Sequence, residues 1–439
     1  MEEIIDFGDA QVFEGATNYT CVVVLDRRGA AEFVYRQVLG DGAQVRRVLV
    51  DVDGLPAERF STGGFGAEPW RLATGEEARL LRTAAAGASP LDEVTRQVFQ
   101  GLITSADRVY ILEDRGRRAG VQRVFSRASG EEHDLEPTLL HSLASGKDLD
   151  RYGFKALRHM LLFPYRRGED GEMRLVSHEE LANLPLTEEY LRRHEETLRR
   201  RERGKMDRAG WYGYVYPKNL GAHDLPKLGV PRMCSRLRAS TDPSGDVYLD
   251  NVDVNGVLTR EDGASAWQLT VRLNSRLMDF VFRRGSVPFR GAFWSANKQF
   301  IAPLPIRPDD DGVLDPLGRT LHRLSTSVAV ESRAFLSWLE DIVDARIPAL
   351  RGSTRLAAYE DHEASTLLAT LALNRRRIAR DPDARTFREL FGTELTASQS
   401  RLRALRAQIG SLERQADDVV YDLYGLDSSQ RALVDAEYT

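Results

Sequence analysis

A basic stretch from Leu191 to Arg208, LRRHEETLRRRERGKMDR, holds the side chains best suited to binding an anionic partner. Between residues 192 and 238 the chain has thirteen Lys or Arg and five Asp or Glu, a local net charge of +8 in a chain of net charge −5. Guanidinium and ammonium groups of this kind contact phosphates and release counterions. The residues assigned to this role are Arg192, Arg193, Arg199, Arg200, Arg201, Arg203, Lys205 and Arg208.

The alternative for this stretch is a solvated helix. Glu195 and Glu196 lie four residues before Arg199 and Arg200, the spacing at which opposite charges pair along a helix. Thr187 is expected to cap a single helix over 187–203, with acidic residues in its first turn.

The next stretch, WYGYVYPKNL, mixes aromatic rings with hydrogen-bonding side chains, as surfaces that read bases do. Lys218 and Asn219 are the expected exposed pair. The alternative is strand packing that places Trp211 and two of the tyrosines in a core.

Two further stretches offer base or backbone contacts. In MCSRLRAS, Arg236 and Arg238 lie two residues apart, on one face of an expected strand, and arginine can bind guanine through two acceptors. In RGAFWSANKQF, Arg290, Asn297 and Lys298 are candidates for contact with a sugar–phosphate backbone. The alternatives are surface arginines on an edge strand and a structural hinge whose aromatic residues pack.

Other kinds of site find no support in the sequence. There is no His-X-X-X-His, no clustered metal-ligand set and no Gly-X-Ser-X-Gly, so no catalytic, cofactor-binding or metal-binding residue is predicted. The two cysteines, Cys21 and Cys234, support neither a disulfide framework nor a zinc site and fit a reducing cytoplasm. No apolar run is long enough to cross a membrane, and the acidic first residues do not predict a secretory signal.

These side chains must be positioned by an α+β fold. The apolar run CVVVL at 21–25 lacks polar alternation, which is typical of a strand buried on both faces. Beyond about residue 307, apolar residues recur at gaps of three and four, which predicts two long helices packed antiparallel. The other expected strands are 4–7, 44–52, 109–113, 121–125 and 159–165, and the other expected helices are 75–87, 91–101, 133–154, 187–203 and 266–285, with a helical turn at 11–16.

Several stretches together resemble adenine-specific DNA methyltransferases that carry a TaqI-like C-terminal specificity domain. They are IIDFGDAQVFEGATNYTCVVVL, QGLITSADRVYIL, LLHSLASGKDLDRYG, LLFPY, LNSRLMDFVFRR, PFRGAFWSANKQFIAPLPI and ADDVVYDLYGLDSSQ, and they follow the family's order over almost the whole chain. The family comprises type II and IIG restriction–modification enzymes and relatives in phage defence. Its Gly-rich loop for S-adenosylmethionine and its Asn-Pro-Pro-Tyr stretch do not occur here.

The resemblance implies the specificity half of such an enzyme. Residues 1–75 would be a remnant of the Rossmann-like methyltransferase sheet, residues 76–306 a mixed α/β target-recognition domain, and residues 307–439 a helical hairpin or coiled coil serving as spacer or docking surface. Double-stranded DNA would be one partner. The other would be the methyltransferase half, as a separate subunit or as a preceding part of a longer chain, and it would bring the S-adenosylmethionine.

The strand formed by CVVVL at 21–25 is expected to present an unpaired edge or an apolar face to the methyltransferase half. The side chains assigned to docking are Ile4, Ile5, Val22, Val24 and Leu25. The alternative is that residues 27–75 cover this edge. The alternative function is a scaffold subunit of a defence complex that does not read DNA, and a nuclease is a third hypothesis with less support.

Overall fold

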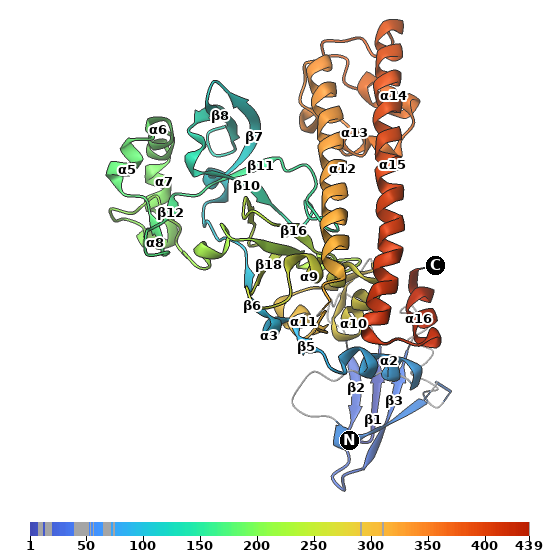
Figure 1. Cartoon of the computed structure of the whole chain (residues 1–439). Coiled ribbons are helices and arrows are strands. Elements are labelled where there is room, and N and C mark those ends of the chain that lie inside the picture. Colours follow the sequence, from blue (N-terminus) through green and yellow to red (C-terminus); the bar gives the residue numbers. More distant parts are fainter. Residues whose placement is uncertain are drawn as a thin grey trace.

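The protein is a mixed α/β molecule with two long helices in its C-terminal third (Figure 1). The computed structural model describes residues 1–7, 12–13, 20–38, 52, 54–55, 57–64, 72, 75–289, 292–309 and 311–438. The expected helical turn at 11–16 and the expected strand at 44–52 fall almost entirely outside these residues. No helix in the described part is both long and apolar enough to cross a membrane.

The N-terminal sheet has the strand order β2-β1-β3-β4. Strand β1 pairs antiparallel with β2 and parallel with β3, and β3 pairs antiparallel with β4. Ile4 and Ile5 point to opposite faces and are both buried, so each face has its own small core. The strands are β1 (Glu3–Asp6), β2 (Cys21–Val24), β3 (Glu32–Gln37) and β4 (Ala57–Ser61).

Strand β2 lies at an edge of this sheet, and within the described residues no strand pairs with its outer side. Its four side chains are all exposed, including Val22 at 43% and Val23 at 46%, and Leu25 beyond it is 75% exposed. The expected exposed edge is therefore present. The expectation of a strand buried on both faces is wrong for the chain by itself, because nothing in the described structure covers either face of β2.

A four-stranded sheet of order β16-β14-β18-β6 packs against helices α9 (Ala266–Asn274) and α10 (Arg276–Gly285). Ser275 separates the two helices, and its hydroxyl accepts from the Met278 N–H as the cap of α10. Helix α2 (Gly75–Ala85) and the end of the last long helix join the same core. The strands are β6 (Thr95–Gln100), β14 (Lys227–Pro231), β16 (Ser240–Asp242) and β18 (Val254–Thr259).

A six-stranded sheet of order β17-β10-β11-β7-β8-β9 supports a separate lobe. Its core also takes in the short helices of residues 178–204 and the loop that follows them. Figure 1 shows these helices at the far left, away from the long helices. The strands are β7 (Ile111–Arg118), β8 (Val121–Ser126), β9 (Glu131–Leu135), β10 (Leu140–Ala144), β11 (His159–Leu162) and β17 (Val247–Leu249).

The predicted long helices are present as α12 (Leu314–Val343) and α15 (Arg385–Tyr424). They run antiparallel: Leu321 shares a core with Val420, whereas Phe335 shares one with Leu395 (Figure 1). Short helices α13 (Ser353–Ala357) and α14 (Ala364–Ala372) connect them, and α16 (Ser428–Asp435) folds back at the end.

Two expected helices are wrong. Residues 95–100 form β6, because this segment pairs along its length with β18. Residues 131–144 form β9 and β10, separated by a turn at Pro137. In both places pairing with a distant strand outweighs the local helical pattern.

Candidate nucleic-acid interface

The basic stretch forms three short helices instead of one. They are α6 (Pro185–Arg193), α7 (Glu195–Arg199) and α8 (Arg201–Gly204), and the chain turns sharply at Glu202 and Arg203, whose φ angles are 48° and 58°. Thr187 is not the cap. It lies buried inside α6, where its N–H and hydroxyl donate to the Glu136 carboxylate over 2.8 and 2.6 Å.

Four of the predicted phosphate contacts are engaged by glutamates on the same helices. Arg192 and Arg193 lie 2.7 Å from Glu188 and Glu189, one turn earlier. Arg199 and Arg200 pair in the same way with Glu195 and Glu196, at 2.8 and 2.5 Å. The geometry of these four arginines is therefore that of the solvated-helix alternative, although a guanidinium at the surface can exchange a weak partner of this kind for a phosphate.

Arg201 is a correction to the predicted set, because it is a structural arginine. It is only 8% exposed, and its guanidinium lies over the Tyr110 ring, 5.6 Å from the centroid. Its nitrogens donate to four backbone carbonyls, those of Leu198, Thr104, Trp211 and Gly213, at 2.7 to 3.1 Å. Four of its five N–H donors are thus used within the chain and the guanidinium is buried, so the residue ties the helices to the loop that follows them and is poorly placed for a phosphate.

The cations left available are those after the helices. Arg203, Lys205, Arg208 and Lys218 are exposed, and none of them forms an ion pair with a carboxylate of the described chain. The Lys205 ammonium lies 5.2 Å from the ring centroid of Tyr216, which is 38% exposed. This segment thus presents positive charge next to an accessible aromatic ring.

The remaining aromatic residues of the segment belong to the core, as the packing alternative predicted. Trp211, Tyr212 and Tyr214 are nearly fully buried. The hydroxyls of Tyr212 and Tyr214 donate to the carbonyls of Val176 and Leu162 at 2.6 and 2.8 Å. Their burial holds the loop rigidly and leaves only its end at the surface.

Asn219 connects this loop to strand β6. It has a φ of 56°, accepts from Gln97 at 3.2 Å and donates to the carbonyl of Gln100 at 3.3 Å. Gln97 and Gln100 are exposed, so their amide groups extend the same polar surface. The sequence reasoning missed them because it took residues 95–100 as a helix, and since side chains three apart in a strand point to opposite faces, a strand assignment alone would not have shown that both are exposed. We call Arg203, Lys205, Arg208, Tyr216, Lys218, Asn219, Gln97 and Gln100 the polar surface.

Arg236 and Arg238 lie beyond the two-residue strand β15 (Met233–Cys234), and both are partly buried. Arg238 donates to the carbonyls of Leu149 and Gly146, at 3.2 and 3.3 Å. Arg236 donates to the Asn274 carbonyl at 3.4 Å, and burial lowers the pKa of its guanidinium. The expectation of two exposed strand arginines is wrong, because both side chains brace neighbouring segments.

The last predicted stretch gives one exposed cation. Lys298 begins α11 (Lys298–Ile301) and is exposed, whereas the Asn297 side chain accepts from Arg232 at 2.8 Å. Arg290 lies outside the described residues. Among the described residues of this stretch, Lys298 is the cation placed where a nucleic-acid backbone could reach it.

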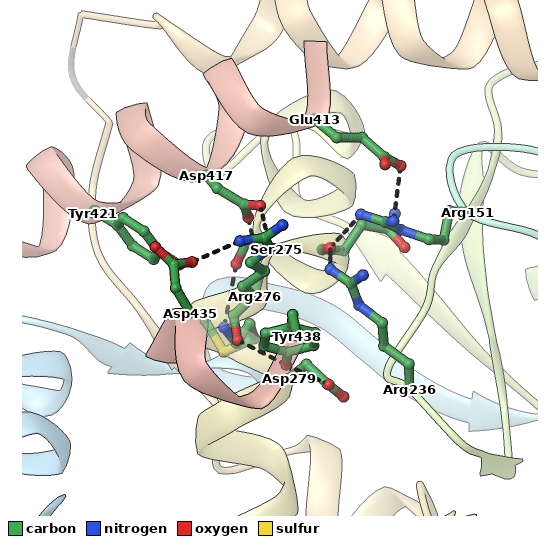
Figure 2. Close-up of polar contacts among 12 residues, drawn as sticks. Arg151, Arg236, Ser275, Arg276, Asp279, Glu413, Asp417, Tyr421, Asp435 and Tyr438 are labelled. Atoms are coloured by element: carbon green, nitrogen blue, oxygen red, sulfur yellow. Dashed lines mark hydrogen bonds and ion pairs between the residues drawn. The ribbon is translucent and has the colours of Figure 1, made fainter. Parts of the chain in front are cut away.

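Arg236 also lies next to a network that fastens the C-terminal helices to the body (Figure 2). Its guanidinium is 4.7 Å from the centroid of the Tyr438 ring. The Tyr438 hydroxyl donates to the buried Asp279 carboxylate at 2.5 Å, and the same carboxylate accepts from the Leu237 N–H at 2.6 Å and pairs with Arg283 at 2.9 Å.

A second set of contacts in this network lies on α15 and α16. The Arg276 N–H donates to Asp417 at 2.8 Å, and its guanidinium lies 2.7 Å from Asp435, which also accepts from Tyr421 (Figure 2). Burial raises the pKa of Asp417. These contacts are consistent with a structural lock, since every acid in them has a donor.

The described residues contain no group of three or more His, Cys, Asp or Glu side chains arranged to hold a metal ion. Cys21 is exposed and Cys234 is buried, and both are free thiols. No known protein-family model matches the chain.

Proposed function

We propose that this chain is the DNA sequence-recognition component of an adenine-specific methylation, restriction–modification or phage-defence system. The observation that carries the proposal is the polar surface, where Lys205 lies over the accessible Tyr216 ring, Arg203, Arg208 and Lys218 of the same segment are exposed, and Asn219 joins the segment to the side-chain amide of Gln97. Lysine and arginine would hold the phosphate backbone, and amide side chains are suited to reading base edges in a groove.

In this proposal the N-terminal sheet is the remnant of a Rossmann-like methyltransferase sheet, and the paired long helices act as a coiled-coil spacer. The methyltransferase half docks on β2 and supplies S-adenosylmethionine. Strand addition would satisfy the free backbone groups of the edge and cover Val22, Val24 and Leu25. Ile4 and Ile5, which were assigned to the same docking, are already buried at 7% and 6% exposure and would contribute nothing further.

Duplex binding tests the recognition role. The affinity of the full chain for duplex DNA is measured by fluorescence anisotropy between 50 and 200 mM salt, for the parent, for Lys205→Ala with Lys218→Ala, and for the control Arg388→Ala at the distant start of α15. The double variant is expected to lower the slope of log K against log salt by about two, and the control to leave it unchanged. Equal slopes for parent and double variant would reject the polar surface as the interface.

The docking role has its own test. Val23→Asp places a charge on the exposed edge strand, and Ser61→Asp places one on the opposite edge strand, β4. Co-purification with a methyltransferase encoded beside this chain should be lost for the first variant and kept for the second. If both variants bind as the parent does, β2 is not the docking edge and the long helices become the better candidate.

The alternative is a scaffold subunit that holds a defence complex together without reading DNA. The glutamate pairing of Arg192, Arg193, Arg199 and Arg200 favours it, because those charges are neutralised within the chain. Adenine methylation mapped in cells with and without the chain separates the two functions. A methylation pattern that does not depend on the chain would support the scaffold.

A further inference from the structure

A cleft of about 500 Å³ lies between the lobe and the long helix α12, on elements that take no part in the polar surface. Strand β7 and the segment 145–158 form one wall, and α12 with the turn after it forms the other. The charged residues that line it are Glu113, Asp114, Arg115, Arg127, Lys147, Arg158, His159, Arg333, Glu340, Asp341 and Arg346.

The lobe wall is built by strand pairing. In the antiparallel pair β7–β11, Glu113 lies opposite His159. The Asp114 N–H donates to the carbonyl of Arg158 at 2.9 Å, which fixes the backbone on which the Arg158 side chain is mounted. The pairing thus places Arg158 and His159 beside the carboxylates of β7.

The loop that carries Lys147 is fixed equally well. Gly146 donates to Asp253 at 2.8 Å, and its carbonyl accepts from Arg238 at 3.3 Å. A bridge between Leu149 and Phe154 closes the loop into a hairpin. Arg238 therefore acts as a positioning residue that holds this loop against the cleft.

Most carboxylates in the cleft are neutralised by arginines. Glu113 pairs with both Arg115 and Arg127, at 3.0 and 3.1 Å. Across the cleft, Asp114 pairs with Arg333 at 2.9 Å, while Arg346 pairs with Glu340 at 3.1 Å. Asp341 is the one lining acid for which the described residues provide no cationic partner at ion-pair distance.

Two lining cations, Lys147 and Arg158, have no ion pair or hydrogen bond from their side chains to another described residue. Burial, and after it the charge of Lys147, lowers the pKa of the neighbouring His159, with a smaller contribution from Arg127, while the charges of Asp148 and Glu113 act in the opposite direction. An ammonium group and a guanidinium fork that approach from different segments suit a tetrahedral oxyanion with several acceptors.

We propose that this cleft binds a phosphate group through Lys147 and Arg158, with Arg127 and Arg333 at its rim. The phosphate can come from a nucleic-acid backbone or from a free phosphate compound, and the chemistry of recognition is the same for both. The site is distinct from the polar surface and does not depend on the proposed recognition role. Because α12 supplies one wall, an occupant would also bridge the lobe and the long helices.

Calorimetry on the full chain tests the site, with inorganic phosphate as one titrant and a short DNA duplex as the other. The variant is Lys147→Ala with Arg158→Ala, and the control is Lys155→Ala, an exposed lysine of the same hairpin outside the cleft lining. Loss of two charged donors should weaken phosphate binding by about tenfold or more, while the control binds as the parent does.

The two titrants identify the source of the phosphate. If duplex binding also falls in the cleft variant, the backbone of a nucleic acid is the occupant; if only inorganic phosphate is affected, the occupant is a free phosphate compound. A parent chain that takes up neither titrant saturably, or a cleft variant that binds both unchanged, overturns the proposal. A rise in the pKa of the His159 imidazole on phosphate binding, followed by NMR, confirms the location and requires a folded protein.

Discussion

Replacing Arg201 by alanine tests whether this arginine is structural, as its four carbonyl contacts indicate. Its guanidinium links α8 to the loop at Trp211 and Gly213 and to the segment at Thr104. The substitution removes a buried charged donor and leaves these carbonyls unpaired in a site that an alanine cannot fill. We expect the lobe to lose about 3–5 kcal/mol of opening free energy.

The neighbouring Arg200 is a matched control. It is one residue away and carries the same charge, but its side chain is 78% exposed and pairs only with the equally exposed Glu196. Arg200→Ala should change the stability by no more than about 0.5 kcal/mol. The contrast separates burial from charge, because both variants remove one positive charge from the same turn.

Hydrogen exchange followed by mass spectrometry measures the opening of this lobe without requiring the whole chain to unfold in one step. Peptides that cover residues 104–112 and 198–214 should exchange about a hundredfold faster or more in Arg201→Ala, and at the parent rate in Arg200→Ala. Lysine at position 201 should give an intermediate rate, since a single ammonium group cannot reach all four carbonyls. Equal protection in the parent and Arg201→Ala would refute the structural assignment and restore Arg201 as a candidate phosphate contact.

Three other outcomes follow from the contacts described above. Tyr438→Phe removes a hydroxyl that donates to the buried Asp279, so the segment 428–438 should lose about 1.5–3 kcal/mol of protection against exchange. Arg238→Ala should free the 145–155 hairpin and weaken phosphate binding in the cleft, without lowering the salt slope that Lys205 and Lys218 set at the polar surface. Burial raises the pKa of Asp250 to about 6, so the folded state holds this proton more tightly than the unfolded chain does; the stability contributed by Asp250 should be present below about pH 4 and lost as the pH rises to about 6. Asp250→Asn should remove that part of the pH dependence in urea denaturation and be more stable than the parent above pH 6; identical pH profiles would contradict the assignment.

Features that depend on local periodicity could be predicted from the sequence. The apolar repeat correctly predicted α12 and α15, because each helix buries one continuous apolar stripe against the other. Helix α2 begins at Gly75, and the chain leaves it through Gly87 at a φ of 67°, a backbone angle that glycine adopts without strain. The i, i+4 spacing likewise predicted the pairs of Glu195 with Arg199 and of Glu196 with Arg200 correctly.

Features that depend on distant partners could not be predicted in this way. Strand β6 forms because β18 lies beside it, more than 150 residues later in the sequence. The single helix expected over 187–203 is interrupted at His194 and turns sharply at Glu202 and Arg203, next to Arg201, whose side chain turns inward to carbonyls from three segments. A cluster of arginines looks uniform in a sequence, but the structure divides it into paired, buried and available members.

The run CVVVL has the pattern of a strand buried on both faces, yet its side chains are exposed in the described structure. An apolar strand without polar alternation has no face suited to water, so its pattern is that of a strand covered on both sides. Within the described residues nothing covers either face of β2, and no strand pairs with its outer edge. A helix packed on one face would leave Val23 or its neighbours exposed on the other. An occupant that extends the sheet at this edge and brings a layer to each face would satisfy the pattern; this is the arrangement of an α/β domain, and for this reason the partner we propose is a methyltransferase sheet and not a single docking helix.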